Sequence, residues 1–184
     1  MILKRSRQDS FFIFKKTLVF FIIENEGMSF NQYSQMMEEL LIMEQFRNEF
    51  NEFPKGKLQK SESPDFILRV SAKNAIGIEL TKLHASAATK YKTHYPRKIK
   101  GFTAPEINLE NLEFTIETKN KKLAYYQKKK LNQIWLLITS DAEENMANYN
   151  LGNKLQNWNF LSGFQKIFLF ELKAVKVFEL NVLR

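Results

Sequence analysis

The segment from residue 61 to residue 84, SESPDFILRVSAKNAIGIELTKLH, contains two apolar runs joined by the short connection SAKN, a spacing typical of a β-hairpin. Side chains alternate between the two faces of a strand. The apolar residues that share a face are Phe66, Leu68 and Val70 in the first strand and Ile76, Ile78 and Leu80 in the second. When these apolar sets are aligned to build a core, Asp65 and Glu79 come together on the opposite face.

The two carboxylates need a partner. An antiparallel register that matches the apolar faces places Asp65 directly across from Glu79 or one step along the diagonal, and like charges at such positions destabilise a sheet. The pair therefore requires a cation between the acids or a protonated carboxyl group. A divalent cation that prefers oxygen ligands, Mg²⁺ above all, is the simplest solution. The alternative is that both acids lie at the exposed edge of the sheet.

Two more charged residues fall on apolar helix faces. Residues 34–53 predict an amphipathic helix, and residues 110–130 predict a second one. Glu39 lies within the apolar stripe of the first helix, and Lys119 lies on the inward face of the second. Because the burial of either charge alone would be costly, we expect both to join the acid pair in one polar site. The alternatives are a frayed first turn for Glu39 and a snorkelling side chain for Lys119.

The remaining segments complete an α/β pattern. Residues 133–140, QIWLLITS, form a continuous apolar run that predicts a strand covered on both sides. Residues 166–180 predict a closing hairpin, residues 57–62 a short edge strand, and residues 141–163 irregular or weakly helical structure. The order of helix, strands, helix and strands indicates one mixed sheet packed against helices, an α/β sandwich without a doubly wound pattern.

The length of 184 residues favours one domain, which we place at residues 28–184. Residues 1–27 form an apolar segment outside this fold. The segment resembles a secretion signal, but Lys15 and Lys16 interrupt its apolar run and no small-residue cleavage site follows. A peripheral helix or strand, or residues upstream of a start at Met28, are the preferred explanations, so no membrane partner is expected.

Composition narrows the function further. The chain has no cysteine, which excludes disulfide partners and favours a reducing cytoplasm, and its two histidines make a multi-histidine zinc site improbable. The net charge of +8 favours polyanionic partners. Cations alternate with aromatic residues between residues 90 and 102, and a solvated loop is the alternative explanation. The predicted nucleic-acid contacts in this segment are Lys90, Lys92, Arg97, Lys98 and Lys100.

At this point the hairpin resembles a known family. SESPDF followed by IGIELT is similar to the PD-(D/E)xK phosphodiesterase superfamily, which includes many restriction enzymes and repair nucleases. Pro64 and Asp65 match the PD element, and Glu79 matches the second acidic element. The resemblance covers residues 36–139. It implies a restriction-endonuclease-like α/β sandwich, in which a central mixed sheet is flanked by helices in the order αβββαβ, followed here by a carboxyl-terminal hairpin.

The resemblance also implies roles for individual residues. The implied metal ligands for Mg²⁺, or for Mn²⁺ in its place, are Asp65, Glu79, the main-chain carbonyl of Leu80 and, as a further acidic ligand, Glu39. The family pattern has a lysine two residues after the second acid, where this chain has Thr81. Members are known in which this lysine has moved to the following helix. Lys119 suits that catalytic role, and Lys122 is the alternative candidate. Thr81 could donate a hydrogen bond in place of the usual lysine.

These observations predict a metal-dependent nuclease that hydrolyses phosphodiester bonds of nucleic acid, with DNA as the expected substrate. Thr81 at the lysine position motivates an alternative, a catalytically inactive domain of the same fold that binds nucleic acid or protein. A third hypothesis is an interaction module that uses residues 1–27. The oligomeric state stays open, with a homodimer as one option.

Overall fold

A computed structural model describes residues 29–84, 106–126, 128–141 and 150–184. Two compact units divide the chain, residues 1–41 and residues 42–184. The predicted apolar segment and the predicted lysine-rich nucleic-acid contacts at residues 90–100 lie outside the described residues. None of the helices in the described ranges is long and apolar enough to cross a membrane.

Helix α2 (Phe30–Glu49) begins in the first unit and ends in the second. Its start is set by a reciprocal pair: the main-chain N–H of Ser29 donates to Gln32 Oε1 at 3.0 Å, and the N–H of Gln32 donates to Ser29 Oγ at 3.4 Å. This arrangement is a capping box. The predicted helix is confirmed, but it begins at Phe30 rather than residue 34, where this cap sets its start, and it ends at Glu49 rather than residue 53.

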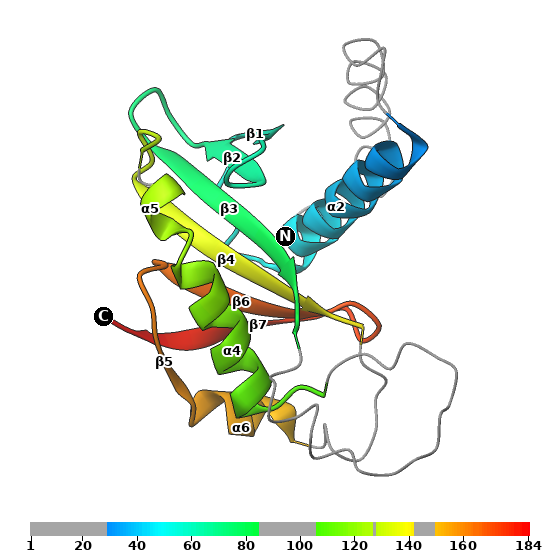
Figure 1. Cartoon of the computed structure of the whole chain (residues 1–184), viewed down its shortest axis with the longest axis vertical. Helices are drawn as coiled ribbons and strands as arrows, with labels where there is room; N and C mark the ends of the chain where they lie inside the picture. The colour runs from blue at the N-terminus through cyan, green and yellow to red at the C-terminus, as the bar shows by residue number, and fades with distance from the viewer. Residues whose placement is uncertain (1–28, 85–105, 127, 142–149) are drawn as a thin grey trace, which may run out of the picture. The chain divides into compact units, whose positions relative to one another are not determined.

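The second unit is built on a seven-stranded mixed sheet in the described part of the chain (Figure 1). In spatial order the strands are β1 (Lys57–Lys60), β2 (Phe66–Arg69), β3 (Ala75–Lys82), β4 (Gln133–Ser140), β6 (Lys166–Glu171), β7 (Lys176–Leu183) and β5 (Asn159–Leu161). The first three strands are antiparallel neighbours, whereas β3, β4 and β6 run parallel. The predicted closing hairpin is present as antiparallel β6 and β7. A mixed α/β architecture is therefore confirmed.

The register of the central hairpin agrees with the one expected from the apolar faces. Phe66 pairs with Ile78, and Leu68 pairs with Ile76. One step beyond the first of these pairs, Asp65 lies opposite Glu79. The turn closes where the N–H of Val70 donates to the carbonyl of Asn74 at 2.9 Å. Asp65 thus directly precedes β2, beside the part of β3 that carries Glu79.

The predicted second helix is divided in two, so the expectation of one helix over residues 110–130 is wrong. Helix α4 (Leu109–Asn120) starts where the Asn108 side chain accepts a hydrogen bond from the N–H of Asn111 at 2.9 Å. It ends at Asn120, whose Oδ1 accepts a hydrogen bond from Ser162 Oγ at 2.7 Å. A short helix, α5 (Leu123–Tyr126), follows. The break between α4 and α5 thus occurs where the Asn120 side chain has a hydrogen-bond partner that is distant in the sequence.

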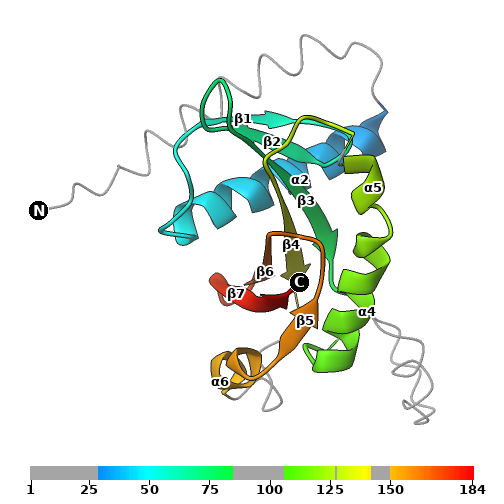
Figure 2. The same ribbon diagram turned by 90° about the vertical axis from the view of Figure 1, so that its left-hand side faces the viewer.

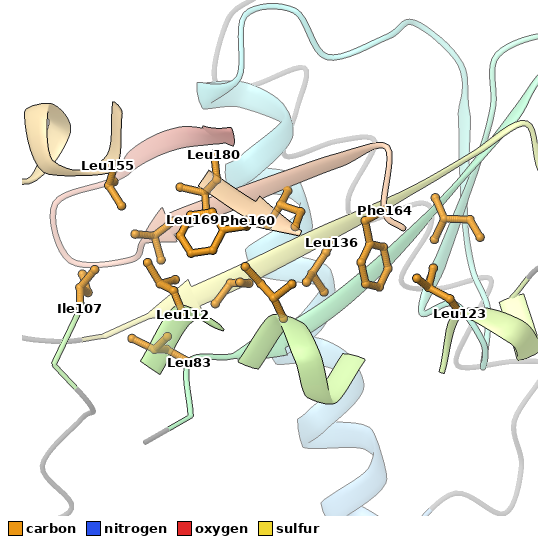
Figure 3. Close-up of a cluster of buried hydrophobic side chains, with 14 of the residues drawn as sticks. Leu83, Ile107, Leu112, Leu123, Leu136, Leu155, Phe160, Phe164, Leu169 and Leu180 are labelled. Carbon is orange, nitrogen blue, oxygen red and sulfur yellow. The ribbon is translucent and has the colours of Figure 1, made fainter. Parts of the chain in front are cut away.

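Helices α4 and α5 lie along one face of the sheet (Figure 1, Figure 2). Their apolar side chains pack on β4, β6 and the segment before β6 in one buried cluster (Figure 3). The main contributors are Leu112, Ile116, Leu123, Leu136, Phe164, Ile167 and Leu169. Burial of this apolar surface is the main favourable term in folding. The result is a helical layer held firmly over the face of β3 that carries Glu79.

The opposite face of the sheet is covered by aromatic rings from the carboxyl-terminal turns of α2 and the residues after it. The Phe50 ring lies 4.8 Å from the Phe168 ring, and Phe46 lies 5.1 Å from Phe168. Phe53 meets Trp135 edge-on at 6.4 Å. Because both faces are covered, β4 is buried along almost its whole length, as its continuous apolar sequence predicted.

The described residues from 150 to 163 contain one element more than expected. Helix α6 (Leu151–Gln156) agrees with the weakly helical prediction, but strand β5 was not predicted. This strand has only three residues and pairs in parallel with β7, and the N–H of Ser162 donates to the carbonyl of Leu183 at 3.1 Å. A strand this short leaves no periodic pattern in the sequence, since its conformation depends on its neighbour.

Gly77 is closely surrounded by Pro64 and Leu131, so its substitution tests how tightly this part of the hairpin is packed. A Cβ atom at this position would lie 2.6 Å from Pro64 Cγ and 2.8 Å from Leu131 Cδ1. We expect Gly77→Ala to reduce the free energy of unfolding by about 2 kcal/mol, because the proline ring and the Leu131 side chain would both have to shift. In the matched control Gly152→Ala, the nearest atom is Phe178 Cε1 at 3.7 Å, and stability should be unchanged or slightly raised. Urea unfolding of both variants would check this, and equal stability would contradict it.

Candidate active site

A buried ion pair links β3 to α4. Lys119 Nζ lies 2.8 Å from Glu79 Oε1, and the two side chains are 13% and 7% exposed. Glu79 is paired across the ladder with Leu136, a member of the buried apolar cluster. A carboxylate in such surroundings is stable only with a close partner of opposite charge and further hydrogen bonds. The structure thus brings together two of the predicted site residues.

The position of Lys119 follows from the way α4 lies along β3. In the middle of the helix, Thr115 Oγ1 accepts a hydrogen bond from the N–H of His84, just beyond the end of β3, at 3.0 Å. Residues four apart share a helix face, so Lys119 projects from the same side one turn later and meets Glu79. Lys122 and Lys82 are both exposed, so the structure places neither in this pair.

Asp65 is held against β3 by its own carboxylate. Its Oδ2 accepts a hydrogen bond from the main-chain N–H of Leu80 at 2.7 Å, and its Oδ1 lies 3.8 Å from Lys60 Nζ. The main-chain N–H of Ser61 donates to the carbonyl of Asp65 at 2.7 Å and closes the loop before β2. The Asp65 carboxylate therefore reaches the main chain directly after Glu79, the arrangement that the hairpin register requires.

Tyr126 is a member of this site that sequence reasoning missed. Its side chain is 2% exposed and lies close to the Glu79 carboxylate. Burial raises the pKa of the Tyr126 phenol well above its usual range, and the nearby negative charges of Glu79 and Asp65 raise this pKa further. In the sequence its ring fits the apolar face of the predicted second helix, which hides the polar role of its hydroxyl group. A buried tyrosine hydroxyl usually finds a polar partner, and that rule was the available signal.

Thr81 lies on the Glu79 side of β3 and is 6% exposed. Its Oγ1 donates to the main-chain carbonyl of Lys82 at 3.3 Å and lies 3.4 Å from His84 Nε2. These contacts occupy the carboxyl end of the strand. The role of Thr81 as a donor in place of the usual lysine stays a prediction.

Glu39 lies in the amino-terminal unit. It is half-buried, and its Oε1 accepts a hydrogen bond from Gln35 Nε2, one turn earlier, at 3.0 Å. This is an ordinary contact between residues four apart on a helix. The role of Glu39 as a further acidic ligand stays a prediction, as does the part assigned to the Leu80 carbonyl. Glu62, just before the PD element, is exposed.

Two acidic side chains near β3 carry the type of ligand atom that Mg²⁺ takes in proteins. In the described ranges, no three His, Cys, Asp or Glu side chains are arranged to hold a metal ion, so a closed zinc-like cage is absent there. Mg²⁺ does not need such a cage, because one or two carboxylates commonly bind it together with waters and substrate phosphates. Asp65 and Glu79 supply such carboxylates, each with about four lone-pair sites when ionised.

The Glu79–Lys119 pair can be measured through stability. We expect Lys119→Met to lower the free energy of unfolding by about 3 kcal/mol, because it leaves Glu79 buried without its cation. Adding Glu79→Gln should recover part of this loss, so a double-mutant cycle should give a favourable coupling energy. The exposed Lys122→Met is the control and should change stability by less than about 0.5 kcal/mol. Additive effects of the two site substitutions would contradict the pairing.

The raised pKa of Tyr126 predicts how the stability of the fold changes at alkaline pH. Because its pKa is raised in the folded state, its contribution to stability is complete below the pKa of an unfolded tyrosine, about 10. Above that pH the unfolded chain releases the proton and the folded chain keeps it, so stability falls by about 1.4 kcal/mol per pH unit. Tyr126→Phe should lack this fall, and the stability difference between wild type and variant should narrow at alkaline pH in urea unfolding. A constant difference would show that Tyr126 ionises normally.

Comparisons of the chain with protein-family models, with curated proteins and with solved structures give no match. No relative therefore contributes to the functional argument. The case for a function depends on the side chains that meet beside Glu79, on their chemistry and on the resemblance of the hairpin to a family pattern.

Proposed function

We propose that this chain is a metal-dependent nuclease that hydrolyses phosphodiester bonds of nucleic acid, with DNA as the expected substrate. The observation that carries the proposal is the ion pair of Glu79 with Lys119 together with the hydrogen bond from the Leu80 N–H to the Asp65 carboxylate, so that two carboxylates and an ammonium group from separate segments contact or belong to residues 79 and 80 of β3. Such a combination is suited to binding a hard cation and a phosphate together. The element order α2, β1, β2, β3, α4, β4 also supports a restriction-endonuclease-like fold.

Asp65, Glu79 and the main-chain carbonyl of Leu80 would hold Mg²⁺, with Mn²⁺ as an alternative ion. When bound, such an ion polarises a phosphate oxygen and lowers the pKa of a coordinated water. The chain contributes the orientation of the ligands. The N–H of Leu80 holds the Asp65 carboxylate, and Tyr126 and Lys119 hold the Glu79 carboxylate. Fixed ligands reduce the reorganisation that the reaction requires.

Lys119 would act as the catalytic lysine. Its ammonium group lies beside Glu79, so it can orient a water molecule near the phosphorus and stabilise the negative charge that develops on the phosphorane oxygens. In the family pattern a lysine on the strand does this work, and here the helix α4 supplies it. The absence of cysteine supports a cytoplasmic setting for the enzyme.

One observation favours a second candidate, a catalytically inactive domain that binds nucleic acid. Thr81 occupies the usual lysine position, and its hydroxyl contacts the Lys82 carbonyl and His84. If Lys119 serves only to neutralise Glu79, the site would keep its fold without turnover. Metal-dependent cleavage by the purified protein would eliminate this candidate.

A plasmid-nicking assay with Mg²⁺, Mn²⁺ or EDTA tests the proposal. We expect cleavage with either metal and none with EDTA. Asp65→Asn and Glu79→Gln should abolish cleavage because they remove a charged oxygen ligand, and Lys119→Met should slow it by about 100-fold or more. Glu62→Gln, an exposed acid close to the same loop, is the matched control and should cleave normally. If the Asp65→Asn and Glu79→Gln variants both still cleave the plasmid, the nuclease proposal is contradicted.

A further inference from the structure

We propose that Lys129, Ser61 and Lys60 form a contact site for a backbone phosphate of the nucleic acid, directly beside Asp65. The inference rests on the proposed function and extends it, because it assigns substrate contacts within the described residues, separate from the segment between residues 90 and 102. The three residues would increase the affinity for nucleic acid and position the strand, whereas Lys119 would act in the reaction itself.

The first step is the link between Lys129 and the loop that carries Asp65. Lys129 Nζ donates a hydrogen bond to Ser61 Oγ at 2.9 Å, although the two residues are 68 positions apart in the chain. The main-chain N–H of Ser61 donates to the Asp65 carbonyl at 2.7 Å. Lys129 is therefore attached to the same short loop that orients the Asp65 carboxylate.

The second step is the rigidity of the segment around Lys129. Leu131 and Pro64 both pack over Gly77 so closely that a Cβ atom there would clash with both. Asn132 exchanges two hydrogen bonds with Ala75: its N–H donates to the Ala75 carbonyl, and its Oδ1 accepts from the Ala75 N–H, each at 2.9 Å. The position of the Lys129 main chain beside the loop is thus set by packing and not only by its long side chain.

The third step is a second ammonium group at the same loop. Lys60, the last residue of β1, places its Nζ 3.8 Å from Asp65 Oδ1 and 4.7 Å from the centre of the Phe66 ring. Its side chain is 16% exposed, so the ammonium group is partly sheltered. Two cations from separate segments therefore gather at a loop whose neighbouring carboxylates are assigned to the reaction.

The chemistry of the group favours a phosphate. The Ser61 hydroxyl is neutral, so its contact with Lys129 leaves the positive charge of the lysine uncompensated by that partner. A serine hydroxyl that accepts from an ammonium group can still donate its own hydrogen to a phosphate oxygen. Lysine and serine are common partners of nucleic-acid phosphates, and such contacts position the strand without reading its sequence. An extended polyanion that passes Asp65 would meet this group next to the scissile bond.

Salt dependence of binding tests the site. Wild type and Lys129→Ala would be titrated, in EDTA, with a fluorescent duplex and a fluorescent single strand at several NaCl concentrations. Because each phosphate contact releases counterions, we expect Lys129→Ala to weaken binding to every sequence alike and to reduce the slope of log affinity against log salt by about one unit. Lys176→Ala is the control: it removes an equal charge from β7, outside the loop that carries Asp65, and should leave the slope unchanged.

The possible results distinguish a failure of the proposed phosphate contact from a failure of the proposed nuclease activity. An unchanged slope for both Lys129→Ala and Lys129→Gln, each folded like wild type by urea unfolding, would overturn the subsite, as would a wild type that binds neither probe. If the binding of polyglutamate depends on Lys129 as strongly as the binding of nucleic acid does, the assignment of this site to a phosphate is overturned. A slope change confined to nucleic acid supports the subsite even if Mg²⁺-dependent cleavage of the same probes fails. Cleavage without a slope change would leave the nuclease and remove the subsite.

Discussion

The buried pair of Glu79 and Lys119 is the interaction on which the rest of this arrangement depends. Glu79 occupies a sheet face that is otherwise built from the side chains of an apolar core, and its charge must be compensated locally. Lys119 can do so only if α4 lies along β3 in one register. The Tyr126 hydroxyl adds a second partner from α5. The same contacts that stabilise the buried acid also hold it in a fixed orientation, as its proposed role as a metal ligand would require.

Most of the sheet could be predicted from local patterns. The hairpin register follows from the alternation of Phe66, Leu68, Ile76 and Ile78, since a slip by one residue would move every apolar side chain to the wrong face. The division of the second helix could not be predicted in this way. It coincides with the hydrogen bond between Asn120 and Ser162, residues whose approach depends on the packed core. Strand β5 was missed for a similar reason, because three residues cannot show a period.

The candidate site was predictable where a charge violated an apolar pattern. Lys119 stood out because an ammonium group on an inward helix face needs an explanation, and Glu79 stood out on its strand in the same way. Tyr126 did not stand out, because its ring fits an apolar face and only its hydroxyl belongs to the polar site. The contact of Lys129 with Ser61 has no sequence signature either, since it depends on how Leu131 and Pro64 pack over Gly77.

Strand β1 forms one border of the sheet, with Lys57 at its start and Lys60 at its end. Border strands expose unpaired main-chain groups that can recruit a strand from another molecule, and lysine at such a border opposes this recruitment. The protection matters for a chain with 17 phenylalanines, whose unfolded or partly folded forms would associate readily. Lys57 is exposed at this border and therefore opposes such pairing, whereas Lys60 lies partly sheltered beside Asp65.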